Sequence, residues 1–199
     1  MAVAARVFFG HGNDMSAQDI FVFTEEPSAK PIIQRIADAL EIGNRVRVVE
    51  HDGVGDLVRS LRMKIKSDQN LNRKFLVLRD ADRLDCNILK RDLIEMIPAG
   101  RRGKALVRIV CQELEAWYLA QPAALKKAGV LASEIPAAIL RRSPDSVQDP
   151  KQVFLKHAHH RGQMDNARKI APHLDIESKV SASFAHAVLA LRRLAAMQP

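Results

Sequence analysis

The sequence is poor in the residues that build covalent or aromatic frameworks. It has 2 cysteines in 199 residues, Cys86 and Cys111, whose spacing matches no metal site and gives only weak support for a disulfide framework. A reducing cytoplasm is therefore the expected compartment. Aromatic residues make up 5% of the chain, beside 47% hydrophobic and 27% charged residues. This composition is typical of α/β or α-rich proteins and argues against a disordered or all-β chain.

Three further sequence features are absent. No apolar run approaches the roughly 20 residues that span a bilayer, and the N-terminus lacks a basic region followed by an apolar stretch and a cleavage site. We therefore expect a chain that is neither inserted in a membrane nor secreted. The P-loop pattern Gly-x-x-x-x-Gly-Lys-Ser/Thr does not occur, so any nucleotide hydrolysis has to come from another chain.

Positive charge is present in excess and is unevenly distributed. The formal net charge is +8, and most of the excess lies after residue 119, where 12 Lys and Arg residues accompany 6 Asp and Glu residues. Neutralisation of phosphates supplies most of the sequence-independent affinity of proteins for nucleic acid. The charge therefore favours a polyanionic partner, with nucleic acid as the first candidate and solubility alone as the alternative.

Hydrophobic spacing alternates between strand-like and helix-like over the first 113 residues. Apolar residues recur at helical spacing after Pro27, a residue that suits the first turn of a helix. Strands separated by helices imply a mostly parallel sheet with both faces covered. We therefore predict an α/β, Rossmann-like fold with about four strands. The expected strands lie near 21–26, 45–50, 75–78 and 105–111, and the expected helices near 27–40, 57–66 and 88–97.

The character of the sequence changes after Glu113. From there the chain reads as short helices separated by prolines, and it closes with a long helix over about 181–196. We expect a core spanning 1–120 and a C-terminal helical annex spanning 121–199 that packs on it. The segment 7–9 resembles a short strand, and we assign it no role.

Two strand-like segments end in acidic residues. The first, at 21–26, ends in Glu25 and Glu26, and the third runs through Arg79 into Asp80 and Asp82. The carboxyl ends of parallel strands meet at one edge of a sheet, and carboxylates are the ligands that hard divalent cations prefer. Both aspartates can serve one ion only if the strand turns at Ala81. The pattern predicts a divalent-metal site, and helix capping by single carboxylates is the alternative.

A second acidic pair, Glu113 and Glu115, precedes an expected helix. These residues are either ordinary first-turn acids or contributors to a second metal position. Trp117 is most simply a core residue, because a single tryptophan at helical spacing usually packs inside. Tyr118 is not expected to form a covalent intermediate, because it lies in the same helix.

Several basic residues are candidates for phosphate contacts. Lys179 precedes the last helix, where capping by Ser181 is the plainer interpretation, and Arg101 and Arg102 lie in a loop flanked by glycines. The histidine cluster at 157–160 has three ligands within four residues, which rarely gives tetrahedral zinc geometry. We interpret that cluster as a solvated, partly basic face.

The order of these motifs resembles the Toprim fold and, within it, the bacterial family known as domain of unknown function four-two-seven-six. The resemblance covers roughly residues 20–195. The segments that carry it are Thr24-Glu25-Glu26-Pro27-Ser28, Leu78-Arg79-Asp80-Ala81-Asp82-Arg83, the run from Gln112 to Ala120, and the run from Ser181 to Phe184.

The resemblance implies a chemistry and a setting. Topoisomerases, bacterial-type primases and nucleases related to overcoming-lysogenization-defect proteins share the Toprim fold. By analogy Glu25 acts in acid/base chemistry or metal binding, Asp80 and Asp82 hold Mg²⁺ or Mn²⁺, and Glu115 holds a second ion. The implied function is a metal-dependent nuclease, working as the effector of a two-component phage-defence system with an ABC-type ATPase partner.

The sequence also departs from the family pattern. Glu26 stands where the family has glycine, Ala29 where an acidic residue is frequent, and Gln121 where an aspartate is usual. These departures leave two alternatives open. One is a catalytically degenerate Toprim-like subunit that binds an ATPase partner or nucleic acid without cutting. The other is a basic α/β domain with a small-ligand site at its strand ends.

Overall fold

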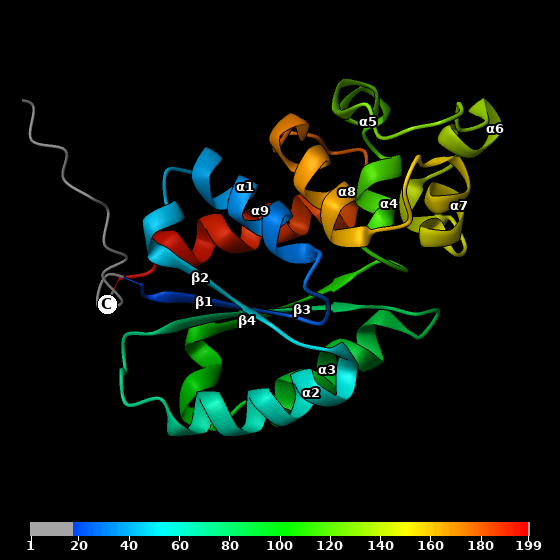
Figure 1. Cartoon of the computed structure of the whole chain (residues 1–199). Helices are drawn as coiled ribbons and strands as arrows, with labels where there is room; N and C mark the ends of the chain where they lie inside the picture. Colours follow the sequence, from blue (N-terminus) through cyan, green and yellow to red (C-terminus); the bar gives the residue numbers. More distant parts are fainter. Residues whose placement is uncertain (1–17, 199) are drawn as a thin grey trace, which may run out of the picture.

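A four-stranded parallel sheet forms the centre of the molecule (Figure 1). The computed structural model describes residues 18–198. The strand order is β2-β1-β3-β4, and each neighbouring pair is parallel. The predicted fold class is therefore confirmed. The strands are β1 (Ile20–Thr24), β2 (Val46–Glu50), β3 (Lys74–Asp80) and β4 (Ala105–Val110).

The two central strands bury side chains on both faces, as their unbroken apolar sequences require. Val22 and Leu76 belong to the core above the sheet. Phe23, Phe75 and Val77 belong to the core below it. Because the pleat sends alternate residues to opposite faces, it also fixes the directions in which the residues at the strand ends leave the sheet.

One helical layer lies below the sheet (Figure 1). It consists of α2 (Gly53–Ser60), which continues into a π-helical segment, η2 (Leu61–Ile65), and of α3 (Cys86–Met96). Leu57, Leu61 and Ile65 are fully buried in the lower core and form an inward-facing stripe at helical spacing, where the sequence predicted a helix near 57–66. The stripe continues through the π-helical segment without interruption.

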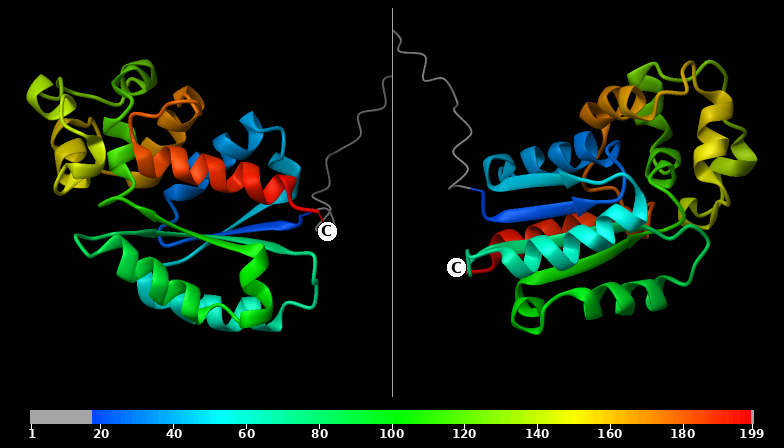
Figure 2. Two further views of the ribbon diagram at one scale, coloured as in Figure 1. Left: turned by 180° about the vertical axis from the view of Figure 1, so that it is seen from behind. Right: turned by 60° about the horizontal axis from the view of Figure 1, so that its bottom comes forward.

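The upper layer joins the start of the chain to its end. Helices α1 (Ala29–Ala39) and α9 (Ala182–Ala196) lie across the upper face of the sheet (Figures 1 and 2). Ser181 caps α9 by accepting a hydrogen bond from the Phe184 amide, as predicted. The last helix therefore covers the sheet, although the predicted annex of 121–199 includes it.

The remaining helices lie beyond the carboxyl ends of the strands, on the upper side (Figure 2). They share one hydrophobic core with α1 and α9, in which Ile36, Trp117, Phe154 and Phe184 are buried. None of the helices within residues 18–198 is long and apolar enough to cross a membrane. The helices beyond the strand ends are α4 (Glu115–Leu119), which lies in the predicted core, and the annex helices α5 (Pro122–Ala128), α6 (Ala137–Leu140), α7 (Pro150–His157) and α8 (Gln163–Ile170). The 3₁₀ turns within residues 18–198 are η1 (Gly43–Arg45), η3 (Ala99–Lys104), η4 (Pro144–Ser146) and η5 (Ala171–His173).

The structure corrects two predicted boundaries. The first strand ends at Thr24, before the acidic pair, and α1 begins at Ala29, so that Pro27 precedes the helix. The reason is a turn in which the Ala29 amide donates to the Glu26 carbonyl, so Glu25 and Glu26 lie in a loop at the edge of the sheet. The predicted strand at 7–9 lies outside the described residues.

The opposite edge of the sheet is held by a buried lysine. The Nζ of Lys74 lies 3.1 Å from an oxygen of Asp19, and its side chain is 2% exposed. Arg45 contacts the same carboxylate at 2.8 Å. We expect Asp19→Ala to lower the free energy of unfolding by about 2–4 kcal/mol, because Lys74 keeps a buried charge without its carboxylate partner. Chemical denaturation measures the change.

Asp165 provides the control for this prediction. Its pairing with Arg168 is at 4.0 Å, and its side chain is 72% exposed. Asp165→Ala should change the free energy of unfolding by no more than about 0.5 kcal/mol. Equal effects of the two substitutions would contradict a buried anchor at Asp19.

Candidate functional site

Five carboxylates gather where the two central strands end, and we call this group the acidic cluster. Asp80 is its centre, because the pKa of its carboxyl is raised well above its ordinary value, first by burial and then by four neighbouring carboxylates. The loop after β1, the turn after β3 and the start of α4 supply these neighbours. The members of the acidic cluster are Glu25, Glu26, Asp80, Asp82 and Glu115.

The turn after β3 sets the directions of the two aspartates. Asp80 is the last residue of the strand, and it points to the upper side, like Leu78 two residues earlier. Ala81 is buried, and its amide donates to the Val110 carbonyl at 2.9 Å. The chain then reverses at Asp82, whose φ is 48°. The turn at Ala81 that the metal hypothesis required is therefore present.

The loops beside this turn hold an unusual share of strained backbone. Asp82, Arg83, Gln112 and Asp149 all have positive φ values without being glycine, which costs about 1 kcal/mol or more per residue. They line one small cleft together with Glu113 and a proline of α7. Such strain concentrates at functional sites, because the surrounding structure must hold it in place.

The annex closes over the acidic cluster. Lys151 of α7 places its Nζ 3.1 Å from Glu26 Oε1. Gln163, at the start of α8, donates to Glu26 Oε2 at 3.2 Å and to Glu115 Oε1 at 3.4 Å. The backbone amide of Lys151 also donates to Glu113 Oε2 at 3.0 Å. A cation and an amide from the annex therefore lie directly against carboxylates of the core.

Glu26 is the link between the two parts of the molecule. Glu26 stands where the Toprim resemblance implies a glycine. Neither Glu25 nor Glu26 has a positive φ. The turn therefore does not require glycine here. The Glu26 carboxylate accepts hydrogen bonds from Ser28, Lys151 and Gln163. Ala29 lines the cleft with Glu25, Glu26 and Asp80, so it contributes a methyl group and no further carboxylate there.

Two oxygens of the cluster accept no hydrogen bond from the described residues. Glu25 Oε2 and Glu115 Oε2 are buried without a hydrogen bond. Burial and the Asp82 carboxylate raise the pKa of Glu25, against the lowering by Arg79, whose Nε lies 3.8 Å away. Unpaired buried carboxylate oxygens are costly, and a bound cation would relieve that cost.

The donor set fits Mg²⁺ or Mn²⁺, because all its ligand atoms are hard oxygens. As placed, however, no group of three or more His, Cys, Asp and Glu side chains within residues 18–198 is arranged to hold a metal ion. Binding therefore requires side chains of the acidic cluster to rotate toward a common point.

Glu115 makes stability depend on pH. Burial, aided by the Glu26 carboxylate, raises the pKa of Glu115 to about 7, against the lowering by its own backbone amide and by Lys151. The folded protein thus keeps a proton that the unfolded chain loses near its ordinary value of 4.5. This contribution to stability is complete below that value and is lost as pH rises through 7. Without metal, the loss should reach about 3 kcal/mol.

Glu115→Gln isolates this effect. The free energy of unfolding, measured by chemical denaturation between pH 5 and pH 8.5, should fall less steeply with rising pH for the variant than for wild type, because glutamine has no proton to lose. Glu134→Gln, at an exposed position, serves as the control and should follow the wild type. Parallel pH profiles of wild type and Glu115→Gln would contradict a buried, protonated Glu115.

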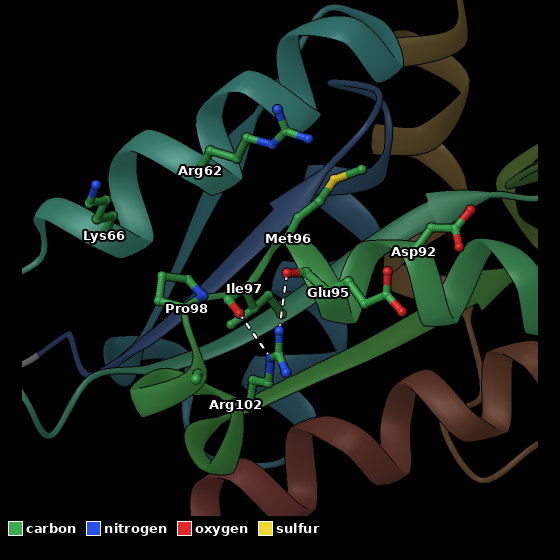
Figure 3. A pocket seen from close by; sticks show the side chains of 9 residues that line it. Arg62, Lys66, Asp92, Glu95, Met96, Ile97, Pro98 and Arg102 are labelled. Atoms are coloured by element: carbon green, nitrogen blue, oxygen red, sulfur yellow. Dashed lines mark hydrogen bonds between the residues drawn. The ribbon is translucent and has the colours of Figure 1, made fainter.

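The predicted phosphate contacts do not all lie near the acidic cluster. Arg101 and Arg102 precede β4, so they lie at the amino end of the sheet, opposite the cluster. Figure 3 places Arg102 in a cavity beside Arg62 and Lys66. Its guanidinium donates to the carbonyls of Ile97 and Glu95, at 3.0 and 3.1 Å. We therefore assign the two arginines no part in the candidate site.

The other sequence candidates take plainer positions. Lys179 is exposed just before α9. Trp117 is fully buried and donates to Ser183 Oγ at 2.8 Å, as a core residue does. Tyr118 is buried against Phe154, and burial followed by the nearby carboxylates raises the pKa of its hydroxyl well above the ordinary value. That environment is unsuited to a nucleophile, as predicted.

The histidine cluster follows the end of α7. His157 Nδ1 lies 2.9 Å from Ser133 Oγ. His159 and His160 are exposed, with ring centroids 6.3 Å apart. The exposure of His159 and His160 agrees with the interpretation of a solvated face.

Sequence reasoning missed Lys151 and Gln163. Both lie in the annex, more than 35 residues after the nearest member of the acidic cluster, and neither stands in a recognisable motif. The basic composition of the second half was the only signal for Lys151, and Gln163 had none. His51 was missed too; it is buried and donates from Nδ1 to the Thr24 carbonyl at 2.9 Å, which fixes the end of β1.

Solved structures with similar folds come from two organisms. The C-terminal region of the Burkholderia pseudomallei OLD protein superposes with a TM-score of 0.62 at 17% identity, covering 90% of this chain and 99% of that one. The C-terminal region of the Xanthomonas campestris pv. campestris OLD protein, phased with platinum, gives 0.54 at 19% identity, covering 89% and 94%. The mercury-phased structure of that region superposes with a TM-score of 0.52 at 14% identity, covering 89% of this chain and 97% of that one. Because the sequence identities are this low, the structural similarity establishes a shared fold and nothing more.

Sequence comparison gives the family. No curated protein matches the chain. A family model described as "Domain of unknown function (DUF4276)" matches residues 23–192, a range that holds the whole acidic cluster together with Lys151 and Gln163. Because the match spans most of the chain and agrees with the resemblance in its motifs, the chain belongs to the DUF4276 family.

Proposed function

We propose that this protein is a Mg²⁺- or Mn²⁺-dependent phosphodiesterase that cuts nucleic acid. The observation that carries the proposal is the convergence of five carboxylates at the carboxyl edge of a parallel sheet, with Asp80 at the centre and a lysine of the annex against them. Ligands of open α/β sheets bind at this edge. Repulsion within the acidic cluster favours a cation there.

The residues divide into metal ligands and groups for the substrate. Asp80, Asp82 and Glu25 are the proposed ligands, and Glu115 is the proposed ligand of a second ion. A bound divalent ion supplies Lewis acidity and lowers the pKa of coordinated water. The pKa of Glu115 is raised to about 7, which suits this residue to accept a proton near neutral pH when it is not bound to metal. Burial and the Asp82 carboxylate raise the pKa of Glu25 as well.

Lys151 and Gln163 are the proposed phosphate contacts. The Glu26 carboxylate raises the pKa of Lys151 despite the opposing effect of burial, so its ammonium group stays charged. A phosphate oxygen can take the place of the Glu26 oxygen as its partner. Gln163 offers a neutral amide donor on the other side of Glu26. The basic annex then binds the remaining backbone through counterion release.

Cleavage of a mixed panel of DNA and RNA substrates tests the proposal. Purified protein should cut at least one of single-stranded DNA, duplex DNA, single-stranded RNA and duplex RNA in the presence of Mg²⁺ or Mn²⁺. EDTA should abolish the cleavage, and added metal should restore it. Persistent cutting in EDTA would contradict metal dependence, and the absence of cutting with every metal would favour the alternative below.

The alternative is a catalytically degenerate subunit that binds nucleic acid or an ATPase partner without cutting. Two observations favour it. Ala29 places a methyl group in the cleft of the acidic cluster, and Lys151 already neutralises part of its charge. Binding of the same panel without cleavage, unaffected by Asp80→Asn, would support this reading.

We further propose that an ABC-type ATPase is the partner, in a bacterial two-component phage-defence system located in the cytoplasm. The family resemblance supports this proposal. Co-expression with an ATPase encoded by a neighbouring gene tests it. Co-purification of the two chains at constant stoichiometry is expected, and independent elution of the two would contradict the partnership.

A further inference from the structure

The two cysteines flank the loops that carry the acidic cluster. Cys86 is the first residue of α3, four positions after Asp82, and Cys111 follows β4, two positions before Glu113. Both thiols are free and partly exposed. Twenty-five residues separate them in sequence, yet they belong to neighbouring segments at the same edge of the sheet.

The fold brings the two cysteines to neighbouring loops. Strands β3 and β4 end in register, with Asp80 opposite Val110. Beyond the strands, the amide of Ala81 donates to the Val110 carbonyl at 2.9 Å, and that of Asp82 donates to the Gln112 carbonyl at 3.1 Å. These two backbone hydrogen bonds hold together the chain segments that lead to Cys86 and Cys111. In agreement with this proximity, Cys86 is among the neighbours that raise the pKa of the Cys111 thiol.

We propose that Cys86 and Cys111 form an oxidisable dithiol, and that a small-molecule disulfide such as glutathione disulfide converts it to an intramolecular disulfide. The bond joins the turn that carries Asp82 to the loop that carries Glu113. This proposal is independent of the proposed nuclease activity, because formation of the disulfide depends only on the positions of the two sulfur atoms.

The chemistry proceeds in two exchanges. The thiolate of Cys86 attacks one sulfur of glutathione disulfide, forms a mixed disulfide and releases glutathione as a thiolate. The thiol of Cys111 then loses its proton and attacks the mixed disulfide at the Cys86 sulfur, which releases the second glutathione. The protein loses two protons and two electrons, and one glutathione disulfide becomes two glutathione molecules.

The environment of Cys111 sets the order of these exchanges. Burial, followed by Asp145 and Cys86, raises the pKa of the Cys111 thiol to about 11, so few Cys111 thiolates are available to attack a free oxidant. Once Cys86 carries glutathione, the second attack is intramolecular and gains from the high local concentration of its target. A transient disulfide of this kind is compatible with a reducing compartment, where the disulfides that occur are usually redox-responsive.

Mass spectrometry of the folded, full-length protein after treatment with glutathione disulfide tests the proposal. Wild type should lose the mass of two hydrogens, lose both free thiols and carry no glutathione. Cys111→Ser should stop at the glutathione adduct on Cys86, because the second thiol is missing. Treatment in denaturant should yield adducts in place of the intramolecular bond. The oxidised protein should melt roughly 5–10 °C higher than the reduced one.

Two results would overturn the proposal. One is folded wild type that carries glutathione on both cysteines, and the other is folded wild type that keeps both thiols free while denatured protein reacts. Neither readout involves metal or nucleic acid, so the outcome is independent of the nuclease proposal. The Cys86→Ser, Cys111→Ser double variant should keep the melting temperature of the reduced wild type and show no response to the oxidant.

Discussion

The Asp80→Asn, Asp82→Asn double variant should lose metal-dependent cleavage by at least about 100-fold. The substitution keeps the size of both side chains and removes the carboxylates proposed to hold the ion, whose charge stabilisation is worth several kcal/mol in the transition state. The variant should fold normally. Burial and like charges raise the pKa of Asp80, so neutralising it removes repulsion, and its melting temperature should equal or exceed that of wild type.

Carboxylates away from the cluster provide the control. Asp92 lies on α3 in the cavity of Figure 3, and Asp165 lies on the annex with an exposed side chain. The Asp92→Asn, Asp165→Asn variant changes the net charge by the same amount and should retain activity within about twofold. Full activity of the Asp80→Asn, Asp82→Asn variant would exclude the acidic cluster as the catalytic site.

Lys151→Met should lower cleavage by about 10²–10³-fold while leaving Mn²⁺ binding intact or stronger. Methionine keeps most of the length of the side chain but cannot hold a phosphate oxygen, and loss of one such donor costs about this much in other enzymes. Metal affinity should not fall, because removing a cation beside Glu26 increases the negative potential of the cluster. Parallel activity assays and Mn²⁺ titrations separate the two effects.

A second variant distinguishes phosphate binding from mere neutralisation of Glu26. If Lys151 only balances that carboxylate, then Glu26→Gln added to Lys151→Met should restore cleavage. If Lys151 contacts the substrate, the double variant should stay as inactive as Lys151→Met. Lys156→Met on the same helix α7, at an exposed position, should behave as wild type in both assays.

The core of the fold could be predicted from the sequence because its signals are local. The apolar runs that became β1 and β3, and the helical stripe of Leu57, Leu61 and Ile65, encode strand and helix in their own spacing. The boundaries near Pro27 were less accurate. There a turn closed by the Glu26 carbonyl competed with the helix-starting preference of proline, and local sequence does not decide between the two.

The acidic part of the site was also predictable, and its basic part was not. Carboxylates that end parallel strands must meet at one edge, so Glu25, Asp80 and Asp82 follow from topology. The contacts of Lys151 and Gln163 depend on how α7 and α8 pack over that edge. That packing is set by long-range burial of residues such as Phe154, which sequence spacing does not specify. Sequence spacing likewise does not show that Cys86 and Cys111 lie in neighbouring loops.

Calorimetric titration of Mn²⁺ into the metal-free protein at pH 7.5 tests the central claim most directly, with the Asp80→Asn, Asp82→Asn variant measured beside it. We predict saturable binding by wild type, partial release of a proton as the raised pKa of Glu115, about 7, falls on binding, and loss of the metal binding in the variant. Absence of saturable binding to wild type, or equal binding to the variant, would contradict a metal site at the acidic cluster.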